Sequence, residues 1–263
     1  MSLTLVKDDD SRGRYILALA KCNKGALAAD EPKPAPASVE GVRMEAMLDQ
    51  SLGQLARSIA GATGVFHEYR LDFCCNGDRR LRDAAQAQGV DGNEVARKLQ
   101  ALQPVAESQD WGAVEPAVLI AHILERFHAR HREQLPELIR LARRVEHVHG
   151  QRPDCPHGVA DHLAYMQHEL EGHMQKEEQI LFPLIQRGAG AMAGGPISVM
   201  RMEHEQHGEA LQRLSDLTND ITPPSHACNT WRALYTGLRT LREDLMEHIH
   251  LENNILFANA EAA

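Results

Sequence analysis

The sequence is short of aromatic residues and cysteine, and it has no long apolar run. Aromatic residues make up 4% of the 263 residues, and runs of β-branched residues are rare. The commonest residues include Ala, Leu, Glu, Gln and Arg, and this composition favours an all-α protein. The five cysteines are too few and too irregularly spaced for a disulfide framework, so we expect a reducing, cytoplasmic environment. No apolar run approaches the roughly 20 residues that span a bilayer, and we recognise no signal peptide.

The sequence also has fewer basic than acidic residues. The 28 Lys and Arg residues are outnumbered by 37 Asp and Glu residues, and the formal net charge is -9. A protein that binds nucleic acid or an anionic membrane through a basic face needs the opposite balance, so we expect neither partner. Histidine is the residue in excess: there are 15, and all but His67 follow residue 114.

Composition and periodicity predict three regions. Residues 1–45 form a flexible N-terminal extension with a Pro/Ala linker at 31–38, a composition typical of extended polyproline conformations. Residues 46–110 form a small helical module, with helices expected at 51–60, 62–69, 79–88 and 91–103, that carries Cys74 and Cys75 in a turn. Residues 111–263 contain four long helices with short connections, typical of an up-down-up-down bundle. These helices are expected at 116–149, 159–187, 196–219 and 229–257.

Each of the four predicted long helices interrupts its apolar seam with potential metal ligands. The clearest case is His173 and Glu177, which lie one turn apart on the inward face of their helix, so both side chains reach the same point. An imidazole and a carboxylate buried among leucines are costly unless something pairs with them. The corresponding residues of the other three helices are His248 and Glu252, His128 and His131, and His204 and His207.

These polar residues are expected at one level of the bundle. Counted from the connections, their depths differ by less than two helical turns at about 1.5 Å per residue. A hydrogen-bonded core histidine is the commoner explanation for any one of them, but it does not account for two His-x-x-x-Glu pairs in register. Four to six imidazoles and two carboxylates exceed the four ligands of a structural zinc ion. Two carboxylates that can bridge, with imidazoles on either side, suit a dinuclear iron or manganese site.

The same residues resemble a known family, the cytoplasmic di-iron proteins for repair of iron–sulfur centres (RIC, of the ScdA, YtfE, NorA and DnrN type). The similarity covers about residues 48–263. It rests on five motifs: Asp72-Phe-Cys-Cys-Asn-Gly77, His128-Ala-Arg-His-Arg-Glu-Gln-Leu-Pro136, His173-Met-Gln-Lys-Glu-Glu-Gln-Ile-Leu-Phe-Pro183, Gly195-Pro-Ile-Ser-Val-Met200 and His248-Ile-His-Leu-Glu-Asn-Asn254.

The resemblance implies a hemerythrin-like bundle that holds two non-haem iron ions with oxo and carboxylate bridges. It implies His128, His173, His204 and His248 as terminal ligands, with Glu177 and Glu252 as bridges. His131 and His207 are weaker candidates, either as ligands or as neighbours of the centre. Hemerythrins that carry oxygen have a second histidine four residues after the one that matches His204, where this chain has Gly208. The open coordination position would accept nitric oxide or dioxygen.

The function that the resemblance implies is a stress response, the repair of iron–sulfur clusters damaged by nitric oxide or peroxide. Damaged iron–sulfur proteins would be the partners, and the electron donor is unidentified. Two routes are open: nitric oxide reductase-like activity at the di-iron centre, or donation of iron to a damaged cluster. The competing function is a protein that binds or senses nitric oxide or dioxygen without turnover. A third possibility is a helical scaffold protein without a metal site, and the layer of buried histidines and glutamates argues against it.

The adjacent Cys74 and Cys75 have a separate hypothesis. They precede a helix N-terminus, whose dipole would favour their thiolates. If the module docks on the bundle, the two thiols would pass electrons or iron, and we therefore predict a thiol-redox role. The alternative is two inert cysteines in a turn.

Overall fold

The computed structural model describes residues 6–7, 15–16, 39–59, 61–102, 111–188 and 190–262. The chain divides into two compact units, Met1–Ser38 and Val39–Ala263. In the first unit, strands β1 (Val6–Lys7) and β2 (Tyr15–Ile16) pair in antiparallel fashion. The predicted linker at 31–38 lies outside the described residues, as does most of the predicted extension.

The second unit begins with five short helices. They are α1 (Val39–Leu48), α2 (Leu52–Ser58), α3 (Ala62–Glu68), α4 (Leu81–Gln88) and α5 (Gly92–Ala101). Helix α2 begins where predicted because Ser51 and Gln54 form a capping box, in which each side chain accepts a hydrogen bond from the other's backbone N–H. Helix α1 was not expected from the sequence, and it spans the predicted boundary between the extension, which ends at residue 45, and the module, which starts at residue 46. The division into extension, module and bundle therefore stays a prediction.

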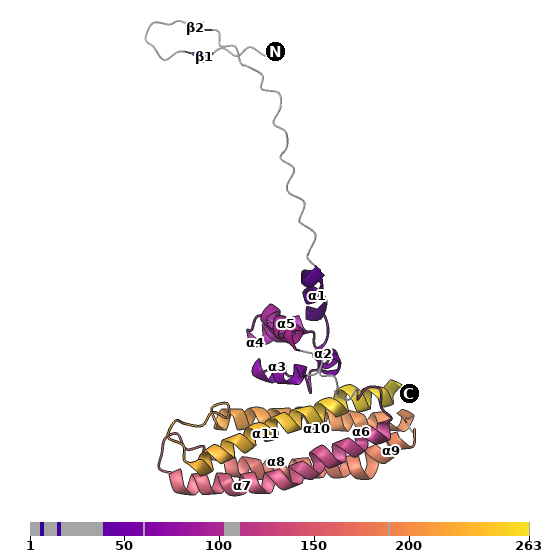
Figure 1. Ribbon diagram of the computed structural model, residues 1–263, viewed down its shortest axis with the longest axis vertical. Coiled ribbons are helices and arrows are strands. Elements are labelled where there is room, and N and C mark those ends of the chain that lie inside the picture. Colours follow the sequence, from indigo (N-terminus) through magenta and orange to yellow (C-terminus); the bar gives the residue numbers. More distant parts are fainter. Residues whose placement is uncertain are drawn as a thin grey trace. The chain divides into compact units, whose positions relative to one another are not determined.

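Four long helical runs follow and confirm the predicted bundle (Figure 1). Helix α7 packs against both α8 and α11, and α10 packs against α8. The first run consists of α6 (Pro116–Ile123), η1 (Leu124–His128) and α7 (Ala129–His149), and the second of α8 (Val159–Lys176), η2 (Glu177–Leu181) and α9 (Phe182–Gln186). The third is α10 (Gly190–Leu217), and the fourth consists of α11 (Asn229–Leu251), η3 (Glu252–Leu256) and α12 (Phe257–Ala262).

Helix α10 begins earlier than predicted. We expected the helix to begin at residue 196, but Pro196 lies inside a helix that starts at Gly190. Glycine and proline cost about 1 and 3 kcal/mol within a helix. Burial offsets part of that cost, because Ala193 and Ile197 lie one turn apart and both are fully buried.

Two apolar clusters enclose the polar layer, one on each side of it along the length of the bundle. On the first run, Phe127 belongs to one cluster and Leu135 to the other, with His128 between them. The same change of cluster occurs across the ligand positions of the other three runs. One cluster also contains the cores of α2 to α5, so the module and the bundle share apolar packing. Each candidate ligand therefore lies between two apolar clusters, where water is excluded.

None of the described helices combines the length and the apolar character that crossing a bilayer requires.

Candidate metal centre

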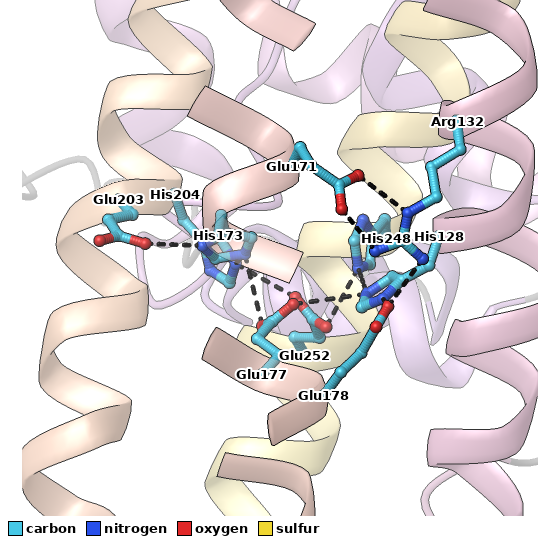
Figure 2. Close-up of polar contacts among 10 residues, drawn as sticks. All are labelled: His128, Arg132, Glu171, His173, Glu177, Glu178, Glu203, His204, His248 and Glu252. Carbon is cyan, nitrogen blue, oxygen red and sulfur yellow. Dashed lines mark hydrogen bonds and ion pairs between the residues drawn. The ribbon is translucent and has the colours of Figure 1, made fainter. Parts of the chain in front are cut away.

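Six of the predicted ligands come together in two overlapping groups. One group is His128, Glu177, His248 and Glu252, and the other is His173, Glu177, His204 and Glu252. Within each group the potential ligand atoms all lie within 4.8 Å of one another. The two groups share both carboxylates (Figure 2), and all six side chains are almost completely buried.

The four imidazoles form two pairs with matching geometry. The Nε2 atoms of His128 and His248 are 3.2 Å apart, and those of His173 and His204 are 3.1 Å apart. Two imidazole nitrogens bound to one ion at about 2.1 Å and at right angles would be separated by about 3.0 Å. Each pair is therefore spaced as two ligands of a single metal ion.

The two carboxylates lie between these imidazole pairs. Glu177 has one oxygen 3.4 Å from His128 Nε2 and the other 3.4 Å from His173 Nε2. Glu252 has one oxygen 3.1 Å from His248 Nε2 and the other 3.1 Å from His204 Nε2. Each carboxylate thus presents one oxygen to each pair, which is the arrangement of a bridging ligand.

Hydrogen bonding satisfies only one of the four carboxylate oxygens, Oε1 of Glu252, which lies 3.1 Å from His248 Nε2. Within the described part of the chain, neither oxygen of Glu177 has a hydrogen-bond partner, and neither does Oε2 of Glu252. A buried carboxylate with unsatisfied oxygens costs several kcal/mol unless cations lie beside it. The donor set of imidazole and carboxylate, and the unsatisfied oxygens at its centre, therefore fit a pair of metal cations.

Three outer residues orient the imidazoles. Glu178 contacts Nδ1 of His128 at 2.8 Å and Glu203 contacts Nδ1 of His173 at 3.0 Å, while the amide oxygen of Asn253 is 2.9 Å from Nδ1 of His204. An imidazole that binds a metal through Nε2 commonly donates its Nδ1 proton to such a group. Figure 2 shows Glu178 and Glu203 on opposite sides of the centre.

Sequence reasoning missed these three residues. The seam pattern marks inward positions at spacings of three and four, but each outer partner is the immediate neighbour of a ligand: Glu178 of Glu177, Glu203 of His204 and Asn253 of Glu252. A polar residue of acceptor type beside a predicted ligand is the signal that would have found them.

Three of the long runs widen into a π turn at a ligand. Segment η1 ends at His128, η2 begins at Glu177 and η3 begins at Glu252. A π turn carries an extra residue and is frequent at functional sites. On the second run Glu177 belongs to both ligand groups, while its neighbour Glu178 contacts the outer nitrogen of His128.

Protons on the imidazoles balance the charge of the two carboxylates. Burial and the Glu252 carboxylate raise the pKa of Glu177, but the surrounding imidazoles lower it more, and the net pKa is lowered. Burial lowers the pKa of His173, but Glu177 and Glu203 raise it more, to about 10. The pKa of His128 is raised in the same way, burial being outweighed by Glu177. A metal ion entering this site must displace those protons.

His131 and His207 belong to neither ligand group. The His131 ring lies 5.4 Å from that of His248, and the His207 ring lies 5.0 Å from that of His173. Burial lowers the pKa of each to about 3, so both are neutral neighbours of the centre. Both nitrogens of His131 and Nε2 of His207 lack hydrogen-bond partners among the described residues.

The predicted thiols lie beside the centre. The Cys75 thiol donates to the backbone oxygen of His204 at 3.4 Å, and the Asn253 amide donates to the backbone oxygen of Cys74 at 3.1 Å. The helix-dipole argument for their reactivity is wrong, because α4 begins only at Leu81 and the dipole acts within the first turn. Hydrogen bonding with Cys75 and burial instead raise the pKa of Cys74 well above its ordinary value.

Comparison with known proteins identifies two family matches. Residues 119–260, which include all six candidate ligands, match the Hemerythrin HHE cation binding domain. Residues 48–103, which include both cysteines, match the ScdA_N domain, described as a domain of unknown function (DUF542).

Curated relatives cover most of the chain. A protein from Dickeya chrysanthemi is 53% identical over 214 residues, which is 81% of this chain and 96% of that relative. Relatives from Yersinia pseudotuberculosis and Pectobacterium atrosepticum are 52% and 51% identical with the same coverage. Each of the three is named iron-sulfur cluster repair protein YtfE.

Proposed function

Because this chain belongs to the family of YtfE-type iron–sulfur cluster repair proteins and carries a hemerythrin HHE domain, we propose that it repairs iron–sulfur clusters damaged by nitrosative or oxidative stress. Damaged iron–sulfur proteins are then its partners. The observation that carries the proposal is the pair of four-residue ligand groups that share Glu177 and Glu252.

The proposed resident group is a pair of non-haem iron ions. One ion is assigned to His128 and His248 and the other to His173 and His204, with bridges from Glu177 and Glu252. Imidazoles with bridging carboxylates favour iron or manganese over structural zinc, which usually has thiolate ligands. When bound, such a pair supplies electrons and an open coordination position for a small molecule such as nitric oxide.

The surrounding residues hold the ligands in place and keep water out. Glu178, Glu203 and Asn253 fix the Nδ1 side of three imidazoles. Two aromatic rings stack on the remaining faces, Phe127 on His248 at 5.4 Å and Phe257 on His204 at 5.9 Å. Each of the four imidazoles thus has an Nδ1 partner, a stacked ring or both, and these contacts orient its Nε2 atom toward the metal position.

The first experiment measures iron in protein purified without oxygen. Wild type is expected to hold about two iron ions per chain, as dinuclear carboxylate bundles do, with the absorption of an oxo-bridged ferric pair after oxidation. The double variant Glu177→Leu with Glu252→Leu should lose both the iron and the absorption. Glu243→Leu, which changes an exposed glutamate on α11, is the matched control. Zinc, a single iron, or unchanged iron in the double variant would refute the bridging arrangement.

A second experiment addresses repair itself. A hydratase whose [4Fe–4S] cluster has been inactivated by nitric oxide should regain activity with wild type and ferrous iron, and not with the double variant. Anaerobic measurement of nitric oxide with a reductant then separates the routes. Nitrous oxide formation supports reduction, and recovery without it supports iron donation. Stoichiometric binding with neither result supports the competing function, a protein that binds the gas without turnover.

A further inference from the structure

A groove of about 850 Å³ runs between the Cys74-Cys75 loop and helix α10. The loop contributes Asp72, Cys74 and Cys75 to its lining, and α10 contributes Glu205, Gly208 and Glu209. Cys74 is buried, whereas Asp72 and Cys75 are partly exposed. The groove therefore gives solvent access to a place where two thiols and a carboxylate meet, outside the six residues of the bundle centre.

The three groups are spaced as ligands of one ion. Their donor atoms all lie within 4.8 Å of one another. The two Sγ atoms are 3.7 Å apart, and Cys74 Sγ is 3.3 Å from Asp72 Oδ1. A tetrahedral ion with bonds of about 2.3 Å to sulfur and about 2.1 Å to oxygen would place its ligands about 3.8 and 3.6 Å apart. The sulfur–sulfur separation matches the first value, and the sulfur–oxygen separation is about 0.3 Å shorter than the second.

The loop is held in this shape by hydrogen bonds. Asp72 Oδ1 accepts from the Cys75 backbone N–H at 3.0 Å, and Asp72 Oδ2 accepts from the Asn76 amide at 2.6 Å. The bundle fixes the same loop through the Cys75–His204 and Asn253–Cys74 contacts described above. Pre-organised donors lower the entropy that must be lost on binding.

We propose that Asp72, Cys74 and Cys75 form a second metal site, which binds one thiolate-preferring divalent ion such as Zn²⁺ or Fe²⁺. Thiolates are soft ligands that select such ions. Both thiol protons leave to solvent as the two sulfur–metal bonds form. Three protein ligands leave the fourth position of the ion open to the groove, as in sites that exchange ligands. The site does not depend on the proposed repair function.

The test uses the reduced full-length protein and Co²⁺ as the probe. Thiolates bound to Co²⁺ give a charge-transfer absorption in the near ultraviolet that imidazole and carboxylate ligands do not. Wild type should show this band and saturate it with one Co²⁺ beyond those held by the bundle. Cys74→Ser with Cys75→Ser should abolish the band. Asp72→Asn should weaken binding at least about tenfold, the lower range for loss of a residue that supports a metal ligand.

Control variants make each outcome decisive. Cys228→Ser, which removes an exposed free thiol elsewhere, should leave the band unchanged. Glu177→Leu with Glu252→Leu should also retain it, so failure of the bundle centre is distinguishable from failure of this site. Helix content and bundle-bound iron show whether each variant is folded. If the cysteine double variant does not fold, the weakened binding expected of Asp72→Asn is the test of the site. A band that survives in the cysteine variant, or no band in fully reduced wild type, would overturn the proposal.

Discussion

At the residue scale, metal binding depends on how each imidazole is oriented as well as on the atoms that touch the ion. His128 has Glu178 on its Nδ1 side, and Glu178 is itself 2.9 Å from Nη1 of Arg132. The charge of Glu178 is thereby held in place, and the pKa of its carboxyl is lowered, because Arg132 and His128 outweigh the effect of burial. Such outer partners typically change metal affinity by roughly 10- to 100-fold.

We therefore expect Glu178→Ala to weaken iron binding by roughly 10- to 100-fold. Glu178→Gln should weaken it less, because its amide oxygen still accepts from Nδ1. Affinity is measured by competition with a ferrous chelator, and Glu133→Ala, an exposed site on α7, is the control. Equal affinities in Glu178→Ala and wild type would show that Glu178 does not orient His128.

The pH dependence of metal binding also belongs to single residues. In the metal-free protein, burial lowers the pKa of His173, but Glu177 and Glu203 raise it to about 10, above the ordinary value. Below that pH an incoming ion must displace a proton, so apparent affinity should rise with pH by up to about tenfold per unit for each displaced proton. Chelator competition at about pH 6, 7 and 8 measures the slope, after correction for the chelator. A flat profile would show that His173 is not protonated.

At the element scale, helix α10 connects the two candidate sites. His204 faces the bundle centre, and Gly208, one turn later, faces the loop that carries Cys75. A Cβ atom at position 208 would lie 3.5 Å from Cys75 Sγ, an ordinary contact distance. A longer side chain would occupy the place of the thiol. Where oxygen-carrying hemerythrins have a histidine, the glycine of this chain thus admits the cysteine loop.

A small and a large side chain at position 208 should consequently change the stability of the protein in opposite directions. Gly208→Ala should be neutral or stabilising, because alanine favours a helix by about 1 kcal/mol over glycine. Gly208→Phe should displace the loop, destabilise the protein by about 1–3 kcal/mol and speed the reaction of Cys75 with a thiol reagent. Thermal unfolding and thiol-labelling rates measure the two effects. Equal behaviour of the alanine and phenylalanine variants would show that the loop does not pack against α10.

At the scale of the whole molecule, one apolar cluster joins the short N-terminal helices to the long bundle. Leu55 of α2 and Trp231 of α11 both belong to it, and both are fully buried. Because they share this core, residues 39–262 should unfold as one cooperative unit.

Leu55→Ala tests this coupling. Deleting a buried leucine side chain costs about 2–5 kcal/mol, and the loss should appear in the melting of the bundle as well as of the module. Fluorescence of Trp111 and Trp231, neither of which lies in α1 to α5, reports the bundle, and Arg57→Ala at an exposed neighbouring site is the control. If the tryptophan transition is unchanged while part of the helix signal is lost at a lower temperature, the module unfolds independently of the bundle.

The sequence alone determined the helical class, the four long helices and the inward positions of the six candidate ligands. These features depend on local periodicity, and a histidine and a glutamate four residues apart must share a helix face wherever that helix packs. Ligation of iron by these six residues stays a prediction. The sequence analysis did not predict helix α1 or the early start of α10, because burial against other elements outweighs weak local helix propensity there.

Only the tertiary structure decided which side chains from different helices meet. Glu203 reaches His173 from 30 residues away, and Cys74 meets Asn253 across 179 residues. The π turns at His128, Glu177 and Glu252 break the regular period on which sequence reasoning depends. The dipole argument for the cysteines failed because α4 begins only at Leu81, and their contacts come instead from α10 and η3. Periodicity shows which way a side chain faces, but packing selects its partner.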